Sequence, residues 1–543
     1  MTIETVAGRD REVLNRTEWP VAGPAAAASR IVPVTLALWG LLFVVEFAAS
    51  VALCDGRLVF TLDDPYIHLA VADHILSGGF GVNASELSSP SSSIIWPYFL
   101  AATEALHLGA FGPLLIDAAA ACATVVTMLR LLQTSGLIAD AGDRPFGYGV
   151  ALLVVFLASA LALPMTGLEH SVHVWASVMT FAGLVRAARG QAPTWLNFAA
   201  LVLLPLLRFE GAAFALAAIA GFALLGRRRF AISAAVVIVC CLAVYAASMV
   251  LRGLPLLPSS VLLKARIAEA AYEHTGALGA IIDNLLASLM SPYGQRLVLL
   301  GLAISGCAWW LRADRRPLIV CGAVLAAISA HLAFGQYDWF YRYEVYIIAL
   351  SALALLWSVA QLRLKLDGRA WAVTRTALLL LLAFVGMPYV SAALVTPFAA
   401  RNIYEQQYQM GRFVHAFYPH PVAVNDLGLV AYKNPNFVLD LWGLGSEPVR
   451  KAKLAGHYGP AQMAALALEH RVDLVMIYDS WFRDGVPQSW TKVAVLHTNL
   501  VTAAGADVAF YRTPTADAAE LTQALAAFAA TLPPRDHMEV LAR

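Results

Sequence analysis

The stretch LDDPYIHLAVADHILSGGFGVNASELSSPSSSIIWP, residues 62–97, decides how the rest of the chain is interpreted. It comes shortly after the first strongly apolar segment and places two adjacent carboxylates, Asp63 and Asp64, near its start. Pro65 prevents a helix from running through this pair, so a helix is expected to start at the proline. Because histidines, further carboxylates and serines follow in the same stretch, the rest of the chain is expected to hold this loop over a cavity.

The composition indicates a protein that crosses a membrane several times. Of 543 residues, 60% are hydrophobic and only 13% are charged, a more apolar balance than soluble domains have. The formal net charge of +1 gives no nucleic-acid footprint. Six cysteines lie in or beside apolar segments without metal-ligand spacing, so they are interpreted as small core residues. The N-terminus lacks a cleavable signal pattern, so the first apolar segment is expected to stay as an anchor.

About eleven apolar stretches are predicted to span the membrane: 31–53, 113–132, 147–163, 171–187, 195–207, 211–225, 230–251, 294–311, 317–335, 343–361 and 371–392. The stretch 94–108 is too short to cross and contains Pro97, Glu104 and His107, so it is predicted to lie as a helix at the outer surface. The arginine-rich ends, such as Arg227–Arg229, then all fall on the cytoplasmic side with the N-terminus. If 94–108 crossed, they would all move outside, against the positive-inside tendency.

The predicted fold is a polytopic α-helical membrane protein with interfacial helices in its first loop and a small C-terminal α/β domain. Residues 1–30 form a cytoplasmic tail, 31–395 a transmembrane catalytic module with first external loop 54–112, and 396–543 the external domain. Strands are predicted at 422–426, 437–443, 472–478, 492–498 and 507–513. A helix is expected at 461–470, and the tail after Pro514 is expected to hold one more helix and a frayed end. Residues 252–293 are treated as an external loop.

Asp63 and Asp64 are the first candidates for chemistry. Adjacent side chains in an extended segment point to opposite sides, so only one is expected to face a substrate. Asp63 is preferred as a general base, and Asp64 as a helix cap or cation ligand. The alternative for the pair is an ordinary turn or cap. Further residues of the same loop are expected to face the same cavity: Tyr66, His68, Glu86 and Trp96.

Other external ends supply the remaining candidates. Glu169 and His170 precede a span and are assigned to the same cavity, with a helix-dipole role as the alternative. Arg208 and Glu210 interrupt an apolar run, which indicates either function or a structural ion pair. Tyr337 belongs to an aromatic run that suits a sugar face or a membrane interface. Cations near the outer surface suit a lipid phosphate, with snorkelling as the alternative, and the candidates are Lys264, Arg266, Arg342 and Arg208.

Five local motifs occur in order along most of the chain: DDPYIHLA (63–70), TGLEH (166–170), LRFEG (207–211), LLPSSVLLKA (256–265) and DLGLVAYKNPNFVLDLWGL (426–444). With the acidic pair in the first loop and the external domain, they make the chain resemble the C-type glycosyltransferase superfamily. The similarity is closest to the branch containing the mycobacterial terminal β-(1→2)-arabinofuranosyltransferase. Phe209 and Ser259 depart from that branch, which often has Pro and Asn there, so the donated sugar and the acceptor stay open.

The resemblance implies an inverting membrane glycosyltransferase in a bacterial cytoplasmic membrane. It would move a sugar, arabinofuranose in that branch, from a polyprenyl-phosphate donor to a cell-envelope glycan or lipid acceptor on the external face. The N-terminus would be cytoplasmic and the C-terminal domain periplasmic. Asp63 or Asp64 would be the base, and the cations near the membrane would hold the phosphate. A requirement for Mg²⁺, Mn²⁺ or Ca²⁺ and the oligomeric state stay open.

Two other classes compete with this hypothesis. A transporter or flippase for lipid-linked sugars needs ionisable groups near the middle of the membrane and repeated halves. A non-catalytic membrane anchor would use its C-terminal domain to bind a partner. The placement of Asp63, Glu169 and Lys264 distinguishes them, because convergence at one external cavity favours the transferase and dispersal favours the anchor.

Overall fold

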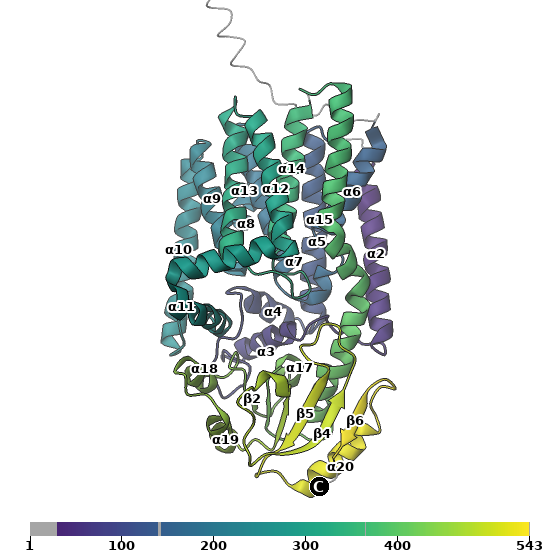
Figure 1. Cartoon of the computed structure of the whole chain (residues 1–543), viewed down its shortest axis with the longest axis vertical. Helices are drawn as coiled ribbons and strands as arrows, with labels where there is room; N and C mark the ends of the chain where they lie inside the picture. The colour runs from purple at the N-terminus through teal and green to yellow at the C-terminus, as the bar shows by residue number, and fades with distance from the viewer. Residues whose placement is uncertain (1–29, 139–142, 364, 542–543) are drawn as a thin grey trace, which may run out of the picture.

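The computed structural model describes residues 30–138, 143–363 and 365–541, without the side chains of 264–275 and 277. A bundle of roughly parallel helices forms one end of the molecule, and a smaller sheet domain forms the other (Figure 1). Two short helices from the predicted first external loop, α3 (Asp64–Leu76) and α4 (Trp96–Glu104), lie between these two parts. The first loop therefore separates the bundle from the domain.

Each of the eleven predicted spans forms a helix: α2 (Ile31–Leu53), α5 (Phe111–Thr134), α6 (Arg144–Leu157), α7 (His170–Ala188), α8 (Trp195–Leu207), α9 (Gly211–Leu224), α10 (Arg228–Leu251), α12 (Pro292–Trp310), α13 (Arg315–Phe334), α14 (Val345–Arg363) and α15 (Gly368–Ile403). Within the described residues, six helices are long and apolar enough to cross a membrane. They are α2, α5, α10, α13, α14 and the continuous helix that begins with α15. These helices support a multi-pass membrane protein, and the count of eleven stays a prediction.

The bundle packs around α14, in which every side chain from Val345 to Ala360 is buried. A helix that is apolar on all sides belongs at the centre of such a bundle, where it meets other helices instead of lipid. By contrast, α2 and α10 leave many large apolar side chains exposed, as Leu41 and Val244 illustrate. The apolar surface of these outer helices is what a lipid environment would cover.

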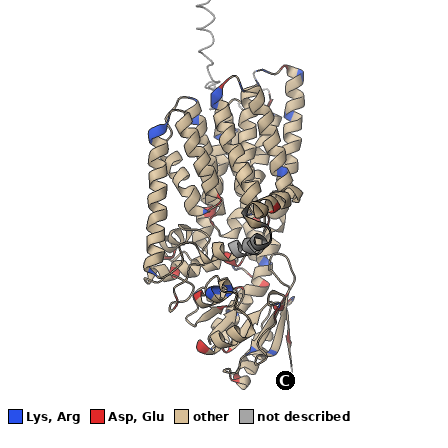
Figure 2. Cartoon of the chain, turned by 60° about the vertical axis from the view of Figure 1, so that its left-hand side comes forward, with Lys and Arg blue, Asp and Glu red and all other residues tan. Residues whose placement is uncertain are grey.

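Basic residues gather at the end of the bundle that lies away from the sheet domain (Figure 2). Arg189 donates to Ser135 Oγ at 2.9 Å, and Arg363 donates to the carbonyl of Gly136 at 2.8 Å. Arg227 donates to the carbonyl of Gly190. The arginine-rich ends therefore meet on one side, as the positive-inside argument requires, and which side is cytoplasmic stays a prediction.

The segment 252–293, predicted as an external loop, contains the helix α11 (Ser259–Met290), which was not predicted. Its sequence is rich in Ala and Leu, which favour helix formation. Gly276, with φ of 68°, interrupts the helix, and Figure 1 shows α11 lying near the end of the bundle that faces the domain. The helix was not predicted because residues 259–290 contain no continuous apolar run.

The domain begins as a continuation of α15 through a π-helical turn (Tyr404–Tyr408) into α16 (Gln409–Ala416). Its six-stranded sheet has the order β2-β1-β3-β5-β4-β6, with parallel pairing of β1 to β2 and β3 and antiparallel pairing elsewhere. The strands are β1 (Val422–Val424), β2 (Val438–Asp440), β3 (Leu474–Ile477), β4 (Thr491–His497), β5 (Asp507–Arg512) and β6 (His537–Val540). The helices are α17 (Gly428–Ala431), α18 (Glu447–Leu454), α19 (Pro460–Glu469) and α20 (Ala518–Ala529).

All five predicted strands and both predicted helices of the domain are present. The predicted frayed end differs, because the chain after α20 forms β6 and pairs antiparallel with β4. Met538 packs inward from β6, while the other three residues of the strand remain exposed. This edge strand has one inward apolar side chain and is too short to show alternation in the sequence.

Candidate active site

A cavity of about 570 Å³ lies between the bundle and the domain. Its bundle side is formed by the start of α3, the serine-rich segment before α4, the start of α7 and the segment 339–343. Its domain side is formed by segments after β1, β2 and β3 and by the β4–β5 connection. This volume is in the range that small-molecule sites commonly occupy.

Contacts from the first loop hold the domain over the cavity. Asn83 makes two hydrogen bonds of 2.9 Å to the backbone of Val438 in β2, one in each direction. The carboxylate of Glu86 accepts from the backbone N–H of Glu447 at 2.9 Å. Thr502, from the β4–β5 connection, donates to the carbonyl of Thr61 at 2.9 Å. The first loop thus positions the domain side of the cavity relative to the bundle.

Asp63 belongs to this interface as well as to the cavity. Its Oδ2 accepts from the N–H of Gly428 at 2.6 Å, and its Oδ1 accepts from the N–H of Leu429 at 2.9 Å. Both donors lie at the start of α17, where helix N–H groups have no partner within the helix. Asp63 is 5% exposed, and its carboxylate joins the bundle to the domain through these two hydrogen bonds.

Asp426 lies beside Asp63 on the domain side. Its Oδ2 accepts from Gln407 Nε2 at 2.7 Å and from the hydroxyl of Tyr478 at 3.2 Å. Burial, together with the Asp64 charge, raises the pKa of Asp426 to about 6 despite these bonds. Burial and the neighbouring Asp426 charge also raise the pKa of Asp63. Two carboxyls this close favour a state in which they share a proton.

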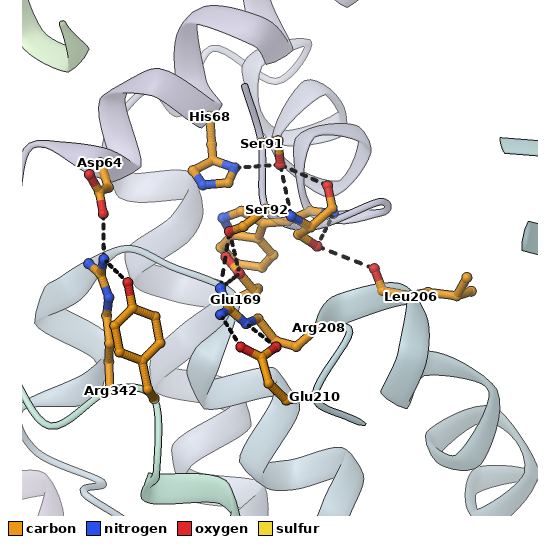
Figure 3. Close-up of polar contacts among 12 residues, drawn as sticks. Asp64, His68, Ser91, Ser92, Glu169, Leu206, Arg208, Glu210 and Arg342 are labelled. Atoms are coloured by element: carbon orange, nitrogen blue, oxygen red, sulfur yellow. Dashed lines mark hydrogen bonds and ion pairs between the residues drawn. The ribbon is translucent and has the colours of Figure 1, made fainter. Parts of the chain in front are cut away.

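Asp64 has different surroundings from Asp63. Its side chain is 38% exposed, and its Oδ2 accepts from Arg342 Nη2 at 2.6 Å (Figure 3). Arg342 is 6% exposed and also donates from Nη2 to the hydroxyl of Tyr343 at 3.0 Å. Its Nε and Nη1 are buried without a hydrogen-bond partner among the described residues. A buried guanidinium with open donors suits an anionic ligand.

Arg208 forms ion pairs with two carboxylates, those of Glu169 and Glu210 (Figure 3). Its Nη1 lies 3.1 Å from Glu169, and its Nη2 lies 2.8 Å from Glu210. Nη1 also donates to Ser92 Oγ at 3.0 Å. The alternative of a structural ion pair therefore describes Arg208 better than the predicted phosphate contact, because its charge is already compensated.

Aromatic rings and histidines connect these charges. Tyr343 lies between the two guanidiniums, with its ring centroid 4.9 Å from Arg342 and 5.4 Å from Arg208. His170 meets the edge of the same ring at 6.0 Å. His68 contacts Ser91 Oγ through Nδ1 at 2.9 Å, and burial lowers its pKa. On the bundle side of the cavity, these polar and aromatic side chains therefore pack against one another.

The structure brings together seven of the predicted site residues in the cavity lining: Asp63, Asp64, His68, Glu169, His170, Arg208 and Arg342. The other predicted cavity residues with described side chains lie outside it. Glu210 reaches it only through Arg208, and Glu86 is used at the domain interface. Tyr66 and Trp96 are buried in the bundle core, and Tyr337 packs against His331. The side chains of Lys264 and Arg266 lie outside the described residues, although Leu263 of the same helix lines the cavity.

The domain side of the cavity was not assigned from the sequence, and its polar and aromatic lining residues include Asn425, Asp426, Gln407, Trp442 and Trp481. Trp442 lies in the DLWG run (440–443), for which the sequence favours a buried core tryptophan over a contact with the membrane module or the acceptor. The segment between β2 and α18 places it in the cavity instead. Among the described residues, no group of three or more Asp, Glu, His or Cys side chains is arranged to hold a metal ion.

Comparisons with known proteins give limited matches. Residues 401–511 match a family model described as a domain of unknown function (DUF8728). No curated protein matches the chain. A solved structure, the Archaeoglobus fulgidus oligosaccharyltransferase in complex with zinc and sulfate, is 12% identical with a TM-score of 0.40. The match covers 84% of this chain and 72% of that one.

Proposed function

We propose that this protein is an integral-membrane glycosyltransferase that moves a sugar from a polyprenyl-phosphate donor to an acceptor hydroxyl in the cavity. The observation that carries the proposal is the contact between Asp64, a partly exposed carboxylate, and Arg342, a buried cation with two open donors. A carboxylate and a cation side by side are what this transfer needs, since a proton must leave the acceptor while negative charge develops on the phosphate.

The reaction follows from these two groups. The acceptor oxygen attacks the anomeric carbon, and the bond from that carbon to the phosphate oxygen breaks with its electron pair on the phosphate. Asp64 takes the proton of the acceptor hydroxyl. Arg342 stabilises the leaving phosphate through Nε and Nη1. One displacement inverts the anomeric configuration. No step is routed through a divalent cation, and a requirement for one stays open.

The arrangement also gives Asp64 a means of activation. In the structure Arg342 Nη2 lies 2.6 Å from Asp64 Oδ2, so this carboxylate is paired with the guanidinium. A phosphate that draws the guanidinium toward itself would weaken this contact. Asp64 would then turn from Arg342 toward the acceptor hydroxyl when the donor is present, which couples proton transfer to the loaded site.

The different surroundings of the two aspartates support Asp64 as the base, although the sequence favoured Asp63. Both oxygens of Asp63 already accept backbone N–H groups from the domain. A proton taken by Asp63 would weaken these contacts at the moment of transfer. We therefore assign Asp63 as a positioning residue that holds the domain wall against the bundle.

The surroundings of α11 support a lipid-linked donor. This helix contributes Ser260 and Leu263 to the cavity lining. Beyond the interruption at Gly276, apolar side chains are exposed at helical spacing, at Leu278, Ile282 and Leu286. A polyprenyl chain lying against this apolar face would keep its phosphate near the bundle side of the cavity.

The competing classes receive less support. Asp63 and Glu169 both line one cavity at the domain end of the bundle, whereas a transporter needs its ionisable groups near the middle of the spans. A purely anchoring bundle gives no reason for a buried guanidinium with open donors beside a carboxylate. Lys264, the third residue expected to meet Asp63 and Glu169 at one cavity in a transferase, has a side chain outside the described residues.

The test is to incubate the purified full-length protein with a panel of labelled polyprenyl-phosphate sugars and candidate acceptors, followed by product analysis. Asp64→Asn should lower turnover by about 10²- to 10⁴-fold, the usual loss on removing a general base. Asp73→Asn, on the same helix but outside the cavity lining, is the matched control and should retain turnover. Asp63→Asn should act mainly on stability. Equal turnover by wild type and Asp64→Asn would refute the assignment of the base.

A further inference from the structure

The domain side of the cavity has a chemistry of its own that the proposed transfer does not use. Trp442 and Trp481 both line the cavity and are partly buried. Their ring centroids are 4.6 Å apart, and their planes are inclined by 54°. Lys453 Nζ lies over the Trp442 ring, 3.8 Å from its centroid, so the two inclined indoles and this ammonium together form an aromatic, positively charged corner of the cavity wall.

The position of Trp442 is fixed by a buried carboxylate. Asp440, at the end of β2, accepts from the N–H of Trp442 at 2.8 Å and from the N–H of Gly445 at 2.7 Å. Gly443, with φ of 93°, makes the left-handed turn between them. Trp481 is held by contact with Tyr478, at 5.6 Å between ring centroids. Both rings are therefore presented on fixed backbone, as a binding surface requires.

Two unsatisfied amide groups also belong to this side of the cavity. Asn425 is 4% exposed, and its Oδ1 accepts from the N–H of Tyr478 while its Nδ2 has no partner in the described part of the chain. Gln407 is 1% exposed and donates through Nε2 to Asp426, while its Oε1 is likewise without a described partner. Buried polar atoms normally have partners, so one unused donor and one unused acceptor in a cavity lining indicate a ligand with hydroxyl groups.

We infer that the domain wall formed by Trp442, Trp481, Asn425 and Gln407 is an acceptor subsite for the terminal sugar of a glycan. A sugar ring has an apolar C–H face, which packs on indole, and hydroxyls, which both donate and accept. The inference rests on the proposed function, and it assigns the acceptor to the glycan class. The lipid-linked donor enters from the bundle side, so the acceptor occupies the opposite wall and directs one hydroxyl to Asp64.

The inference is tested by saturation-transfer NMR on the full-length protein in nanodiscs without donor. The probes are the methyl glycosides of a pentofuranose and a hexopyranose. Wild type should transfer saturation to ring C–H protons of at least one glycoside. Trp442→Ala and Trp481→Ala should each weaken its binding about tenfold or more, while Phe at either position should retain most of it. Trp490→Phe is the matched control, since Trp490 lies in the domain core away from the cavity.

The Phe variants guard against loss of folding, and a transfer assay provides a second readout. There, the two Ala variants should raise KM for the glycan acceptor about tenfold without raising KM for the donor. Equal glycoside binding by wild type and both Ala variants overturns the subsite, and so does the absence of glycoside binding by folded wild type. If glycosides bind through the tryptophans but no polyprenyl-phosphate sugar is consumed, the proposed function fails and the subsite stands. If transfer proceeds normally in both Ala variants, the proposed function stands and the subsite fails.

Discussion

Replacing Arg342 with alanine is the substitution that separates donor binding from folding most clearly. The guanidinium is 6% exposed, donates to Asp64 and Tyr343, and keeps two N–H-bearing nitrogens without described partners. In the account above, a phosphate oxygen uses these nitrogens. The alanine variant removes both contacts to the phosphate, and it also removes the partner of Asp64.

The magnitude follows from the kind of bond that is lost. A charge-assisted hydrogen bond typically contributes about 1.5–3 kcal/mol, and each 1.4 kcal/mol corresponds to a factor of ten. Arg342→Ala should therefore lower kcat/KM for the donor by about one to two decades, or more if both nitrogens contact the phosphate. Arg342→Lys keeps the charge without the planar fork, so it should recover only part of this loss.

The assay is initial-rate kinetics with a labelled polyprenyl-phosphate sugar at fixed acceptor concentration, with thermal unfolding of each variant measured in parallel. Arg252→Lys is the control, because Arg252 is a partly buried cation of the bundle outside the cavity lining. Donor KM and kcat both unchanged in Arg342→Ala would refute the assignment of the phosphate site. Loss of activity together with a collapse of the unfolding temperature in both Arg342 variants would show a structural role instead.

Three other predictions address the interface and the topology. Gly428→Ala should loosen the domain from the bundle, because a Cβ atom there would lie 2.1 Å from the carbonyl oxygen of Asp63; limited proteolysis should cut the variant faster between the two parts, and unchanged cutting would contradict the interface. The pKa of Asp426 is raised to about 6, so this carboxyl contributes stability below its unfolded pKa near ~4 that is lost as pH rises through 6. Thermal stability should therefore fall between about pH 4 and about pH 6, with a weaker fall in Asp426→Asn, and a rise over this range would contradict the buried carboxyl pair. Cysteines placed at Arg228 and Asn436 should be labelled from opposite sides of the membrane, and labelling of both from one side would refute the eleven-span topology.

The sequence was sufficient for the parts of the fold that depend on local pattern. Apolar runs of sufficient length predicted the helices of the bundle, and short alternating or buried runs predicted β1 to β5. The helix α11 was missed because its polar stretches break the apolar run, and β6 was missed because four residues carry little pattern. Local periodicity therefore predicted most elements, and it failed where an element was short or of mixed polarity.

The site was predicted less completely, because it depends on contacts between distant segments. The partners of Asp63 are the N–H groups of Gly428 and Leu429, which nothing near Asp63 in the chain indicates. Glu86 likewise contacts Glu447, which is far away in the sequence, so its role at the domain interface was not predicted. Arg342, singled out as a planar cation suited to phosphate, lines the cavity, and its contact with a phosphate stays a prediction.

A doubly labelled donor allows the sugar and the lipid phosphate to be followed separately in one reaction. Purified wild type in proteoliposomes receives a polyprenyl-phosphate sugar labelled in the sugar and in the lipid, together with a glycan acceptor. We expect sugar label to appear on the acceptor with inverted anomeric configuration, in equal amount to released polyprenyl phosphate, and Asp64→Asn to lower both by about 10²- to 10⁴-fold. Transport of the intact donor across the bilayer without cleavage, or transfer that continues undiminished in Asp64→Asn, would contradict it.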